Sequence, residues 1–219
     1  MALDIKICGL KTDAALAAAL AGGASHVGFI FFARSPRHVD PAEAGRLRQA
    51  VRGKAKAVAV SVDASDAVLD AIVAGMQPDM LQLHGQETPA RVAALKKRYG
   101  LPVMKALPVS EAADLDAVGP YLGIADRFLF DARPPKEALL PGGNGIAFDW
   151  RLLAGLDGRI DYMLSGGLDA TNVGQALRLA HPPGIDISSG VESAPGIKEP
   201  ALIEEFFRAV TAATDNPAA

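Results

Sequence analysis

Residues 3–31, LDIKICGLKTDAALAAALAGGASHVGFIF, contain the pattern that decides the fold. A short apolar run, 3–8, is followed by an alanine-rich segment of helical length, 12–21, and then by a second apolar run, 26–31. Such alternation is typical of strand–helix–strand units in a parallel sheet. Thr12 suits the start of the helix because its hydroxyl can accept a hydrogen bond from a backbone N–H of the first turn.

The same alternation continues to residue 213 and predicts eight strands and eight helices. The predicted strands span residues 3–8, 26–31, 55–62, 80–84, 102–106, 127–131, 161–164 and 184–187. The predicted helices span residues 12–21, 41–51, 65–74, 88–99, 110–122, 149–156, 169–180 and 200–213. Eight such units favour an α/β fold with a single closed (β/α)8 TIM barrel over a doubly wound open sheet. We expect one domain over residues 1–213 and a frayed tail over 214–219.

Composition and charge exclude several classes of function. The 22 basic and 25 acidic residues leave a formal charge of −3, which argues against nucleic-acid or anionic-membrane partners. No apolar run approaches the roughly 20 residues that cross a bilayer, and the start MALDIKICGLK lacks the pattern of a signal peptide. The only cysteine, Cys8, cannot form an internal disulfide, which suits a reducing compartment. We therefore expect a cytoplasmic protein, either a monomer or a homodimer.

Two reactive side chains end predicted strands. Cys8 ends the first strand, Asp131 ends the sixth, and loop-type residues follow both. In (β/α)8 barrels the chemistry is placed at the carboxyl ends of the strands, so we expect these groups to face each other across one mouth. A lone cysteine is more often a small buried hydrophobic residue, however. A strand-end aspartate can equally anchor a loop, so position alone leaves both interpretations open.

Strand alternation also places polar side chains on the inward face of the barrel. Lys6 shares a face with Cys8 on the first strand, and Asp186 shares a face with Ser188 on the last. Because the first and last strands become neighbours when a barrel closes, we predict a buried ion pair between Lys6 and Asp186. Asp186 either serves only that pair or also touches a sugar hydroxyl. His84 ends the inward set of the fourth strand, where it either contacts a ligand or shapes the following loop.

Two loops carry the pattern of a phosphate site. Ser165-Gly166-Gly167 follows the seventh strand, and Ser188-Ser189-Gly190 follows the eighth. In such barrels these two loops commonly hold a phosphate on bare backbone N–H groups, and glycine permits the close approach of the anion. Either loop alone is explained as well by a tight turn, but together they predict a phosphate site. Glu192, just beyond the second loop, is expected to hold its shape.

The four histidines predict no metal site. They are scattered among helices and strands without metal-ligand spacing. His26 and His181 lie at the ends of predicted elements, where we expect surface residues.

The strings that carry these residues resemble one enzyme family, phosphoribosylanthranilate isomerase of tryptophan biosynthesis, whose members are single (β/α)8 barrels. The matching strings are KICGL (6–10), SPRHV (35–39), LQLHG (81–85), LFDARPP (129–135), GGNGIAFDW (142–150), LSGGLDATNV (164–173) and GIDISSGVESAPGIKE (184–199). They cover nearly the whole chain in the family's order. One departure is Asn144, where the family usually has threonine. It lies in the Pro- and Gly-rich segment 132–147, which we expect to be mobile or to cover the substrate.

The resemblance implies an Amadori rearrangement of N-(5-phosphoribosyl)anthranilate to 1-(2-carboxyphenylamino)-1-deoxyribulose 5-phosphate. Ring opening needs a proton at the ring oxygen, and the resulting Schiff base must lose its C2 proton, so the reaction needs one acid and one base. By resemblance, Asp131 is the acid and Cys8 is the base. Arg37, otherwise a solvated loop charge, would bind the anthranilate carboxylate. The resemblance implies no metal or organic cofactor. A cation such as Lys6 would increase the thiolate fraction of the base.

Three other interpretations compete with this one. The histidine-pathway sugar isomerase performs the same rearrangement on a larger bis-phosphate, but that family resembles two half-barrels and has an aspartate in place of Cys8. Indoleglycerol-phosphate synthase carries a catalytic lysine–glutamate set and a longer N-terminal extension. An inactive phosphate-binding barrel is disfavoured because both Cys8 and Asp131 are retained.

Overall fold

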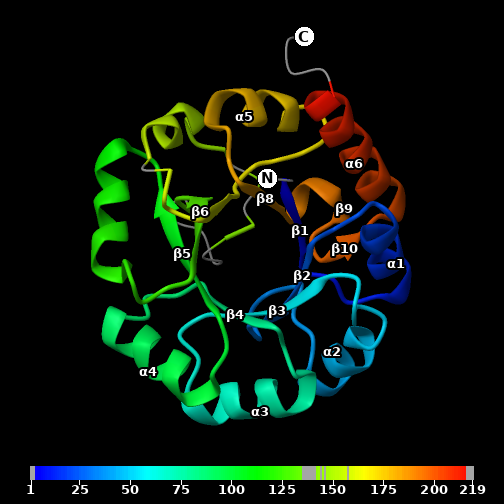
Figure 1. Ribbon diagram of the computed structural model, residues 1–219. Helices are drawn as coiled ribbons and strands as arrows, with labels where there is room; N and C mark the ends of the chain where they lie inside the picture. The colour runs from blue at the N-terminus through cyan, green and yellow to red at the C-terminus, as the bar shows by residue number, and fades with distance from the viewer. Residues whose placement is uncertain (1–2, 135–141, 144, 146, 157, 216–219) are drawn as a thin grey trace.

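Eight parallel strands form a closed barrel, viewed along its interior in Figure 1. The computed structural model describes residues 3–134, 142–143, 145, 147–156 and 158–215. Each strand pairs with the next in sequence, and the last pairs with the first. The strands are β1 (Asp4–Cys8), β2 (His26–Phe31), β3 (Lys56–Ser61), β4 (Met80–Leu83), β5 (Val103–Val109), β6 (Arg127–Ala132), β7 (Tyr162–Leu164) and β8 (Gly184–Ile187). The predicted TIM barrel is confirmed.

Helices surround the barrel as an outer ring (Figure 1). The α-helices are α1 (Asp13–Ala21), α2 (Pro41–Arg48), α3 (Asp66–Met76), α4 (Pro89–Tyr99), α5 (Val173–Ala180) and α6 (Pro200–Asp215). Helix α6 therefore extends two residues beyond its predicted end, and residues 216–219 of the predicted tail lie outside the described residues. A short antiparallel hairpin, β9 (Glu192–Ala194) and β10 (Ile197–Lys198), follows β8.

Two of the predicted helices are 3-10 helices instead of α-helices. They are η1 (Ala112–Tyr121), within the predicted helix 110–122, and η2 (Trp150–Gly155), within the predicted helix 149–156. In η1, Gly119 and Pro120 are poor α-helix formers, since glycine loses more backbone entropy and proline lacks an N–H. A third 3-10 turn, η3 (Ser189–Val191), lies in the second predicted phosphate loop.

Capping residues fix where the helices begin. The hydroxyl of Thr12 accepts a hydrogen bond from the Ala15 N–H at 3.4 Å, as the sequence predicted. The Asp40 carboxylate accepts from two backbone N–H groups at the start of α2, where Pro41 takes the first position. These bonds satisfy donors that the helix itself leaves unpaired.

The apolar core has two layers, divided by the barrel wall. The outward side chains of the strands pack against the helices in one large cluster. The inward side chains form a smaller separate cluster, made by Cys8, Val58, Val60, Met80, Met104, Ala106, Leu129 and Met163. Cys8 is the member that ends β1, so its thiol lies at the junction between this inner cluster and the mouth of the barrel.

His26 is buried, and the expectation of a surface position was wrong. Its place at the start of β2 suggested exposure, but alternation turns its side chain toward the barrel interior, leaving 2 % exposed. Its Nδ1 lies 2.8 Å from the Ser25 hydroxyl. Burial lowers the pKa of His26 to about 4. Asp4 opposes this shift, whereas Arg127 and the lysines at positions 6 and 56 reinforce it. His181 is exposed, as predicted.

The neutral state of His26 makes stability depend on pH. Because the folded pKa is about 4 and the ordinary value is 6.5, the unfolded chain binds the extra proton between these limits. Stability is therefore lost as the pH falls from about 6.5 towards 4, by at most about 2 kcal/mol between pH 7 and 5. Urea unfolding of wild type and His26→Gln at both pH values measures this: the variant should lose about 2 kcal/mol less. Equal losses in the two proteins would contradict the assignment.

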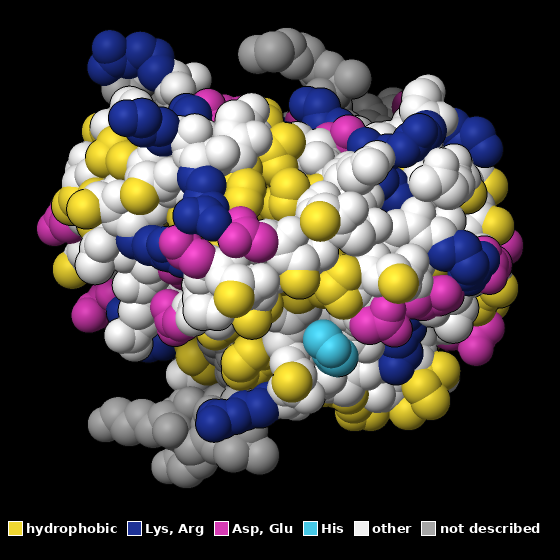
Figure 2. All heavy atoms as spheres, turned by 90° about the horizontal axis from the view of Figure 1, so that it is seen from below, with side chains coloured by type: hydrophobic (Ala, Val, Ile, Leu, Met, Phe, Trp, Pro, Cys, Tyr) yellow, Lys and Arg dark blue, Asp and Glu magenta, His cyan; other side chains and the backbone are white. Residues whose placement is uncertain are grey.

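The helical surface carries charges of both signs. Figure 2 views the molecule from the side of α3 and shows Lys and Arg beside Asp and Glu, with hydrophobic atoms in small separate groups. Ion pairs join α3 to α4, among them Arg98 with Asp70 at 2.6 Å. Exposed pairs of this kind contribute little to stability, because solvent and salt screen the charges. In the described part of the chain, no helix is both long and apolar enough to span a bilayer.

Candidate active site

One cavity at the carboxyl ends of the strands collects the side chains predicted to be functional. Cys8 from β1, Asp131 from β6 and Asp186 from β8 line it. Arg37 reaches it from the loop after β2, and His84 from the residue after β4. These five residues, distant in sequence, therefore face one space. Among the described residues, no three His, Cys, Asp or Glu side chains are grouped to hold a metal ion.

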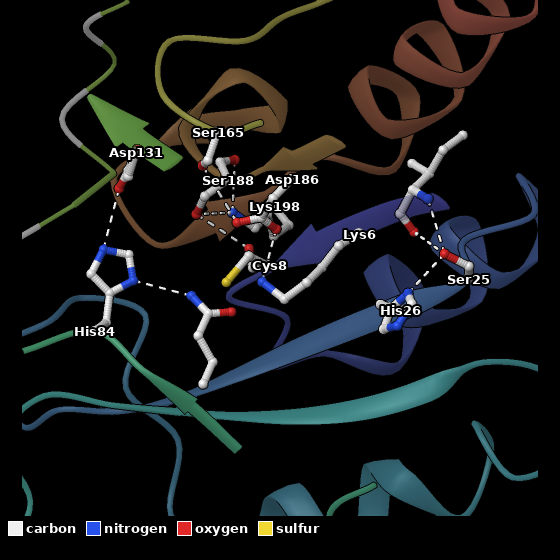
Figure 3. Close-up of polar contacts among 12 residues, drawn as sticks. Lys6, Cys8, Ser25, His26, His84, Asp131, Ser165, Asp186, Ser188 and Lys198 are labelled. Carbon is white, nitrogen blue, oxygen red and sulfur yellow. Dashed lines mark hydrogen bonds and ion pairs between the residues drawn. The ribbon is translucent and has the colours of Figure 1, made fainter. Parts of the chain in front are cut away.

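Beneath the cavity, Lys6 forms the predicted ion pair with Asp186. Its Nζ lies 2.8 Å from Oδ1 of Asp186, and both side chains are almost fully buried (Figure 3). The second carboxylate oxygen of Asp186 lies 3.5 Å from the Ser165 hydroxyl, so Asp186 both pairs with Lys6 and reaches the cavity. Burial raises the pKa of the Cys8 thiol, and the Lys6 ammonium opposes that rise. The expected effect of the cation is present, but burial outweighs it.

A chain of polar contacts leads from Gln82 through His84 to Asp131. Figure 3 shows the contact between His84 and Asp131. The Gln82 amide nitrogen lies 3.1 Å from His84 Nδ1, and His84 Nε2 lies 3.3 Å from Asp131 Oδ2. Because an amide nitrogen only donates, Nδ1 accepts and the ring proton of a neutral His84 is at Nε2. The Nε2–H of His84 then lies beside Asp131 Oδ2, and the other oxygen of Asp131 accepts from the Ala132 N–H at 3.0 Å. The chain thus orients the carboxyl group and solvates its ionised form.

Arg37 is held by a carboxylate partner from the hairpin after β8. Its Nε and Nη2 donate to the two oxygens of Glu192 at 2.7 and 2.8 Å, a two-pronged geometry that fixes the plane of the guanidinium. Lys198 of the same hairpin donates to Glu192 at 2.7 Å and to the Ser188 carbonyl at 2.8 Å. Glu192 therefore supports the loop after β8 through Lys198, and it also fixes the side chain of Arg37.

Lys198 is a site residue that the sequence reasoning missed. It is almost fully buried, and its ammonium joins the loop after β8 to the partner of Arg37. Strand periodicity does not reach it, because it lies in a hairpin outside the barrel ladder. The only available signal was its place within the string 184–199, GIDISSGVESAPGIKE.

The two glycine–serine loops meet at the cavity as predicted from their order in the chain. Ser165, Gly166, Gly167, Ser188 and Ser189 line it. Gly166 and Gly167 adopt left-handed backbone conformations, with φ of +89° and +66°, which residues other than glycine rarely adopt. A Cβ on Gly166 would also lie 2.6 Å from the Ala132 nitrogen. The loop after β7 therefore depends on glycine both for its turn and for its packing.

Gly190 has a different position from the other predicted loop residues. It packs against the backbone of the neighbouring loop, where a Cβ would lie 2.0 Å from the Leu168 carbonyl oxygen. Its lack of a side chain lets the two loops approach each other. The pair of loops thus forms one continuous rim of backbone at the mouth.

Part of the segment after β6 also reaches the cavity. A Cβ on Gly142 would lie 2.5 Å from Asp131 Oδ2, and one on Gly143 would lie 2.6 Å from Arg37 Nη1. Arg37 Nη2 donates to the Gly143 carbonyl at 3.3 Å. Asn144 and most of the remaining segment 132–147, predicted to be mobile or to cover the substrate, lie outside the described residues.

Comparisons with known proteins give one consistent family. The family model described as N-(5'phosphoribosyl)anthranilate (PRA) isomerase matches residues 5–209. The chain is 78% identical over 219 residues to N-(5'-phosphoribosyl)anthranilate isomerase of Mesorhizobium japonicum, covering 100% of both chains. It is 66% identical over 217 residues to the Brucella canis protein of the same name, covering 99% of this chain and 98% of the relative.

Solved structures agree with the sequence comparisons. Phosphoribosyl anthranilate isomerase of Thermotoga maritima is similar at a TM-score of 0.85 and 30% identity, over 96% of this chain and 100% of that one. Monomers generated from the dimeric Thermotoga maritima protein give a TM-score of 0.82 at 29% identity, with the same coverage. A phosphoribosyl anthranilate isomerase in complex with reduced 1-(o-carboxyphenylamino)-1-deoxyribulose 5-phosphate also gives 0.82 and 29%, again with that coverage.

Proposed function

The chain belongs to the N-(5'-phosphoribosyl)anthranilate isomerase family, and we propose that it performs the family's isomerisation with Cys8 as the base and Asp131 as the acid. The observation that carries these roles is one shared cavity, which is lined by a thiol, a carboxyl group and residues of two glycine–serine loops. The family's reaction converts an aldose phosphate to a ketose phosphate in tryptophan biosynthesis. Proton transfers alone accomplish this conversion, so an acid and a base suffice.

The proposed acid acts first. A protonated Asp131 delivers its proton to the ring oxygen of the substrate, and the ring opens to a Schiff base. His84 Nε2–H and the Ala132 N–H then stabilise the carboxylate that remains. N–H donors bind a carboxylate more strongly than a neutral carboxyl group, so this arrangement favours the transfer of the proton from Asp131 to the substrate. In this proposal His84 supports the acid.

The proposed base acts second. The Cys8 thiolate removes the C2 proton from the Schiff base. The electrons of the C2–H bond form the C1–C2 double bond, and those of the C=N bond move to the substrate nitrogen, which gives an enolamine. Tautomerisation to the ketone completes the reaction. Asp186, from the strand beside Cys8, is placed to accept a hydrogen bond from a sugar hydroxyl with the oxygen that does not bind Lys6.

The ends of the substrate would be held by separate groups. The backbone and hydroxyl groups of the loops at 165–167 and 188–190 suit the phosphate, because Gly166 and Gly167 let an anion approach the backbone and the serine hydroxyls can donate hydrogen bonds. Arg37 suits the anthranilate carboxylate, because Glu192 fixes its guanidinium plane at the cavity wall. The reacting carbons then lie between these two ends, within reach of the acid and the base.

Direct assay tests the proposal. Purified protein mixed with freshly made phosphoribosylanthranilate should remove the anthranilate fluorescence and release a product with the mass of the substrate. The bis-phosphate substrate of the histidine-pathway isomerase should give no turnover. Binding of phosphoribosylanthranilate without turnover would instead support the inactive-barrel alternative.

Replacing Arg37 by lysine should weaken substrate binding. A lysine keeps the charge but cannot make the two-pronged contact with Glu192, so its position at the cavity wall is lost. We expect kcat/KM to fall about 10- to 100-fold, mostly through a higher KM. Arg34 is an exposed residue of the same loop, so Arg34→Lys is the matched control and should leave both constants unchanged. Equal behaviour of the two variants would remove Arg37 from the site.

The remaining expectations stay predictions. The chain is proposed to be a single barrel domain, to act in the cytoplasm without a cofactor, and to be a monomer or a homodimer. Sedimentation of the purified protein across a range of concentrations distinguishes the two assembly states.

A further inference from the structure

A fully buried ammonium lies beside the proposed base. The Lys6 side chain is 0 % exposed, and its Nζ contacts Asp186 Oδ1 at 2.8 Å. The ammonium has three N–H donors. Within the described residues, Asp186 Oδ1 is the one oxygen atom to which it donates a hydrogen bond. Figure 3 shows Nζ between the carboxylate of Asp186 and the sulfur of Cys8. The sulfur of Cys8 therefore lies beside an ammonium with a single oxygen acceptor among the described residues.

Gly28 provides the space in which the sulfur and the ammonium meet. In the barrel ladder Gly28 of β2 is the neighbour of Cys8, as Asp186 of β8 is the neighbour of Lys6. A Cβ on Gly28 would lie 2.9 Å from Cys8 Sγ and 3.1 Å from Lys6 Nζ, so both atoms occupy the volume where a side chain would begin. Gly28 is not among the glycines with a left-handed backbone, so space rather than conformation explains its presence.

A second buried lysine nearby is not equivalent. Lys198 also favours the ionised form of Cys8, but it donates to the Ser188 carbonyl, the Ser188 hydroxyl and Glu192. These three acceptors match its three donors. Among the described residues, Lys6 has one oxygen acceptor, Asp186, and its charge acts on that carboxylate and on the sulfur of Cys8.

The surroundings make a nearby charge important. Cys8 belongs to the apolar cluster inside the barrel, where the dielectric response is low and a charge interacts strongly. The other charged or titratable groups around it are Asp186 from β8, which disfavours a thiolate, Lys198 from the hairpin, and, lining the cavity, Arg37, His84 and Asp131. His26 of β2 neighbours Lys6 in the ladder on the opposite side from the mouth.

We propose that Lys6 is a positioning residue for the base: its ammonium, held by Asp186 in the space left by Gly28, makes the Cys8 thiolate attainable inside an apolar barrel. Asp186 keeps the ammonium charged and in place, because an unpaired buried lysine would lose its proton. The catalytic meaning rests on the proposed role of Cys8, but the ionisation itself can be measured without turnover.

The single cysteine of the chain makes that measurement unambiguous. The ultraviolet absorbance of the thiolate is followed against pH in the intact protein, with the matching Cys8→Ala protein as the blank. Lys6→Met should raise the pKa of the Cys8 thiol by about one unit or more, which lowers the thiolate fraction about tenfold at a given pH below that pKa. The pH dependence of kcat should move in the same direction.

Lys105 provides a matched control. It is as deeply buried as Lys6 and pairs with Glu87 at 2.9 Å, but it belongs to the outward side of β5. Lys105→Met therefore also removes one partner of a buried ion pair, and it should leave the thiol pKa unchanged. A similar shift in both variants would show a general loss of structure and overturn the proposal.

A second variant covers the case in which Lys6→Met does not fold. The double replacement Lys6→Met with Asp186→Asn removes both charges of the pair and leaves no unpaired buried charge. It should still raise the pKa of the Cys8 thiol, because the influence of Lys6 on Cys8 exceeds that of Asp186. An unchanged thiol titration in the folded variant overturns the proposal. Full activity of Cys8→Ala would instead overturn the proposed function.

Discussion

The Cys8→Ala protein should bind its substrate and fail to convert it. The variant lacks the group proposed to remove the C2 proton, so kcat should fall by about 10²- to 10⁴-fold, a typical loss for a missing general base. KM should change little, because the phosphate loops and Arg37 do not depend on the sulfur. Steady-state kinetics with phosphoribosylanthranilate measures both constants.

Controls separate chemistry from folding in this variant. Removing one buried sulfur atom is expected to cost about 1 kcal/mol of stability, which leaves the barrel folded. Binding of the reduced product analogue should be retained, since its phosphate and carboxylate are proposed to bind at the two ends of the site. Cys8→Ser should also be slow, because a hydroxyl ionises far less readily than a thiol. A Cys8→Ala enzyme with a kcat near that of wild type would remove Cys8 from the mechanism.

The barrel and much of its site were predictable because strand alternation and closure are strong constraints. Lys6 and Asp186 are 180 positions apart, yet alternation turns both inward and closure makes their strands neighbours. The same reasoning places Cys8 and Asp131 at strand ends on one mouth. These predictions use only the period of a strand and the order of the strands.

Contacts made by loops could not be predicted in the same way. Lys198 was missed, and the role of Glu192 was predicted only in part, because a hairpin after the last strand has no period that fixes its direction. His26 was misplaced because the end of an element was taken as exposed, whereas the strand's alternation turned it inward. The rule that residues at the ends of elements are exposed failed for His26, because the closed barrel buries the inward side chains of its strands.

The 3-10 segments show a further limit of periodicity. Segments 112–121 and 150–155 fill helical positions in the ring, and their apolar side chains pack as a helix would. Their place in the chain was predictable because every strand needs a crossover of sufficient length. In segment 112–121 the departure from α-helical winding goes with Gly119 and Pro120, which are poor α-helix formers.

Asp131→Asn should be the second variant with a nearly complete loss of turnover. Asparagine has the shape of aspartic acid, and its one carbonyl oxygen can keep either the contact with His84 or the hydrogen bond from the Ala132 N–H, but it has no acidic proton to deliver to the ring oxygen. Ring opening then proceeds without its acid, and kcat should fall by about 10²- to 10⁴-fold with little change in KM. Asp161→Asn, at an exposed carboxylate at the opposite end of the barrel, is the control and should behave as wild type.

Substrate deuterated at C2 then separates the acid from the base. In Cys8→Ser, removal of the C2 hydrogen limits the rate, so deuterium should slow turnover by the full primary effect. In Asp131→Asn, the earlier ring opening limits the rate, so the isotope effect on kcat should shrink towards unity. The isotope effect on kcat of His84→Gln should lie between the values of wild type and Asp131→Asn. This variant weakens the contact that supports the acid but leaves the acid its proton. A full isotope effect in Asp131→Asn would show that the carboxyl group acts at the C2 step, and the assignment of acid and base would have to be revised.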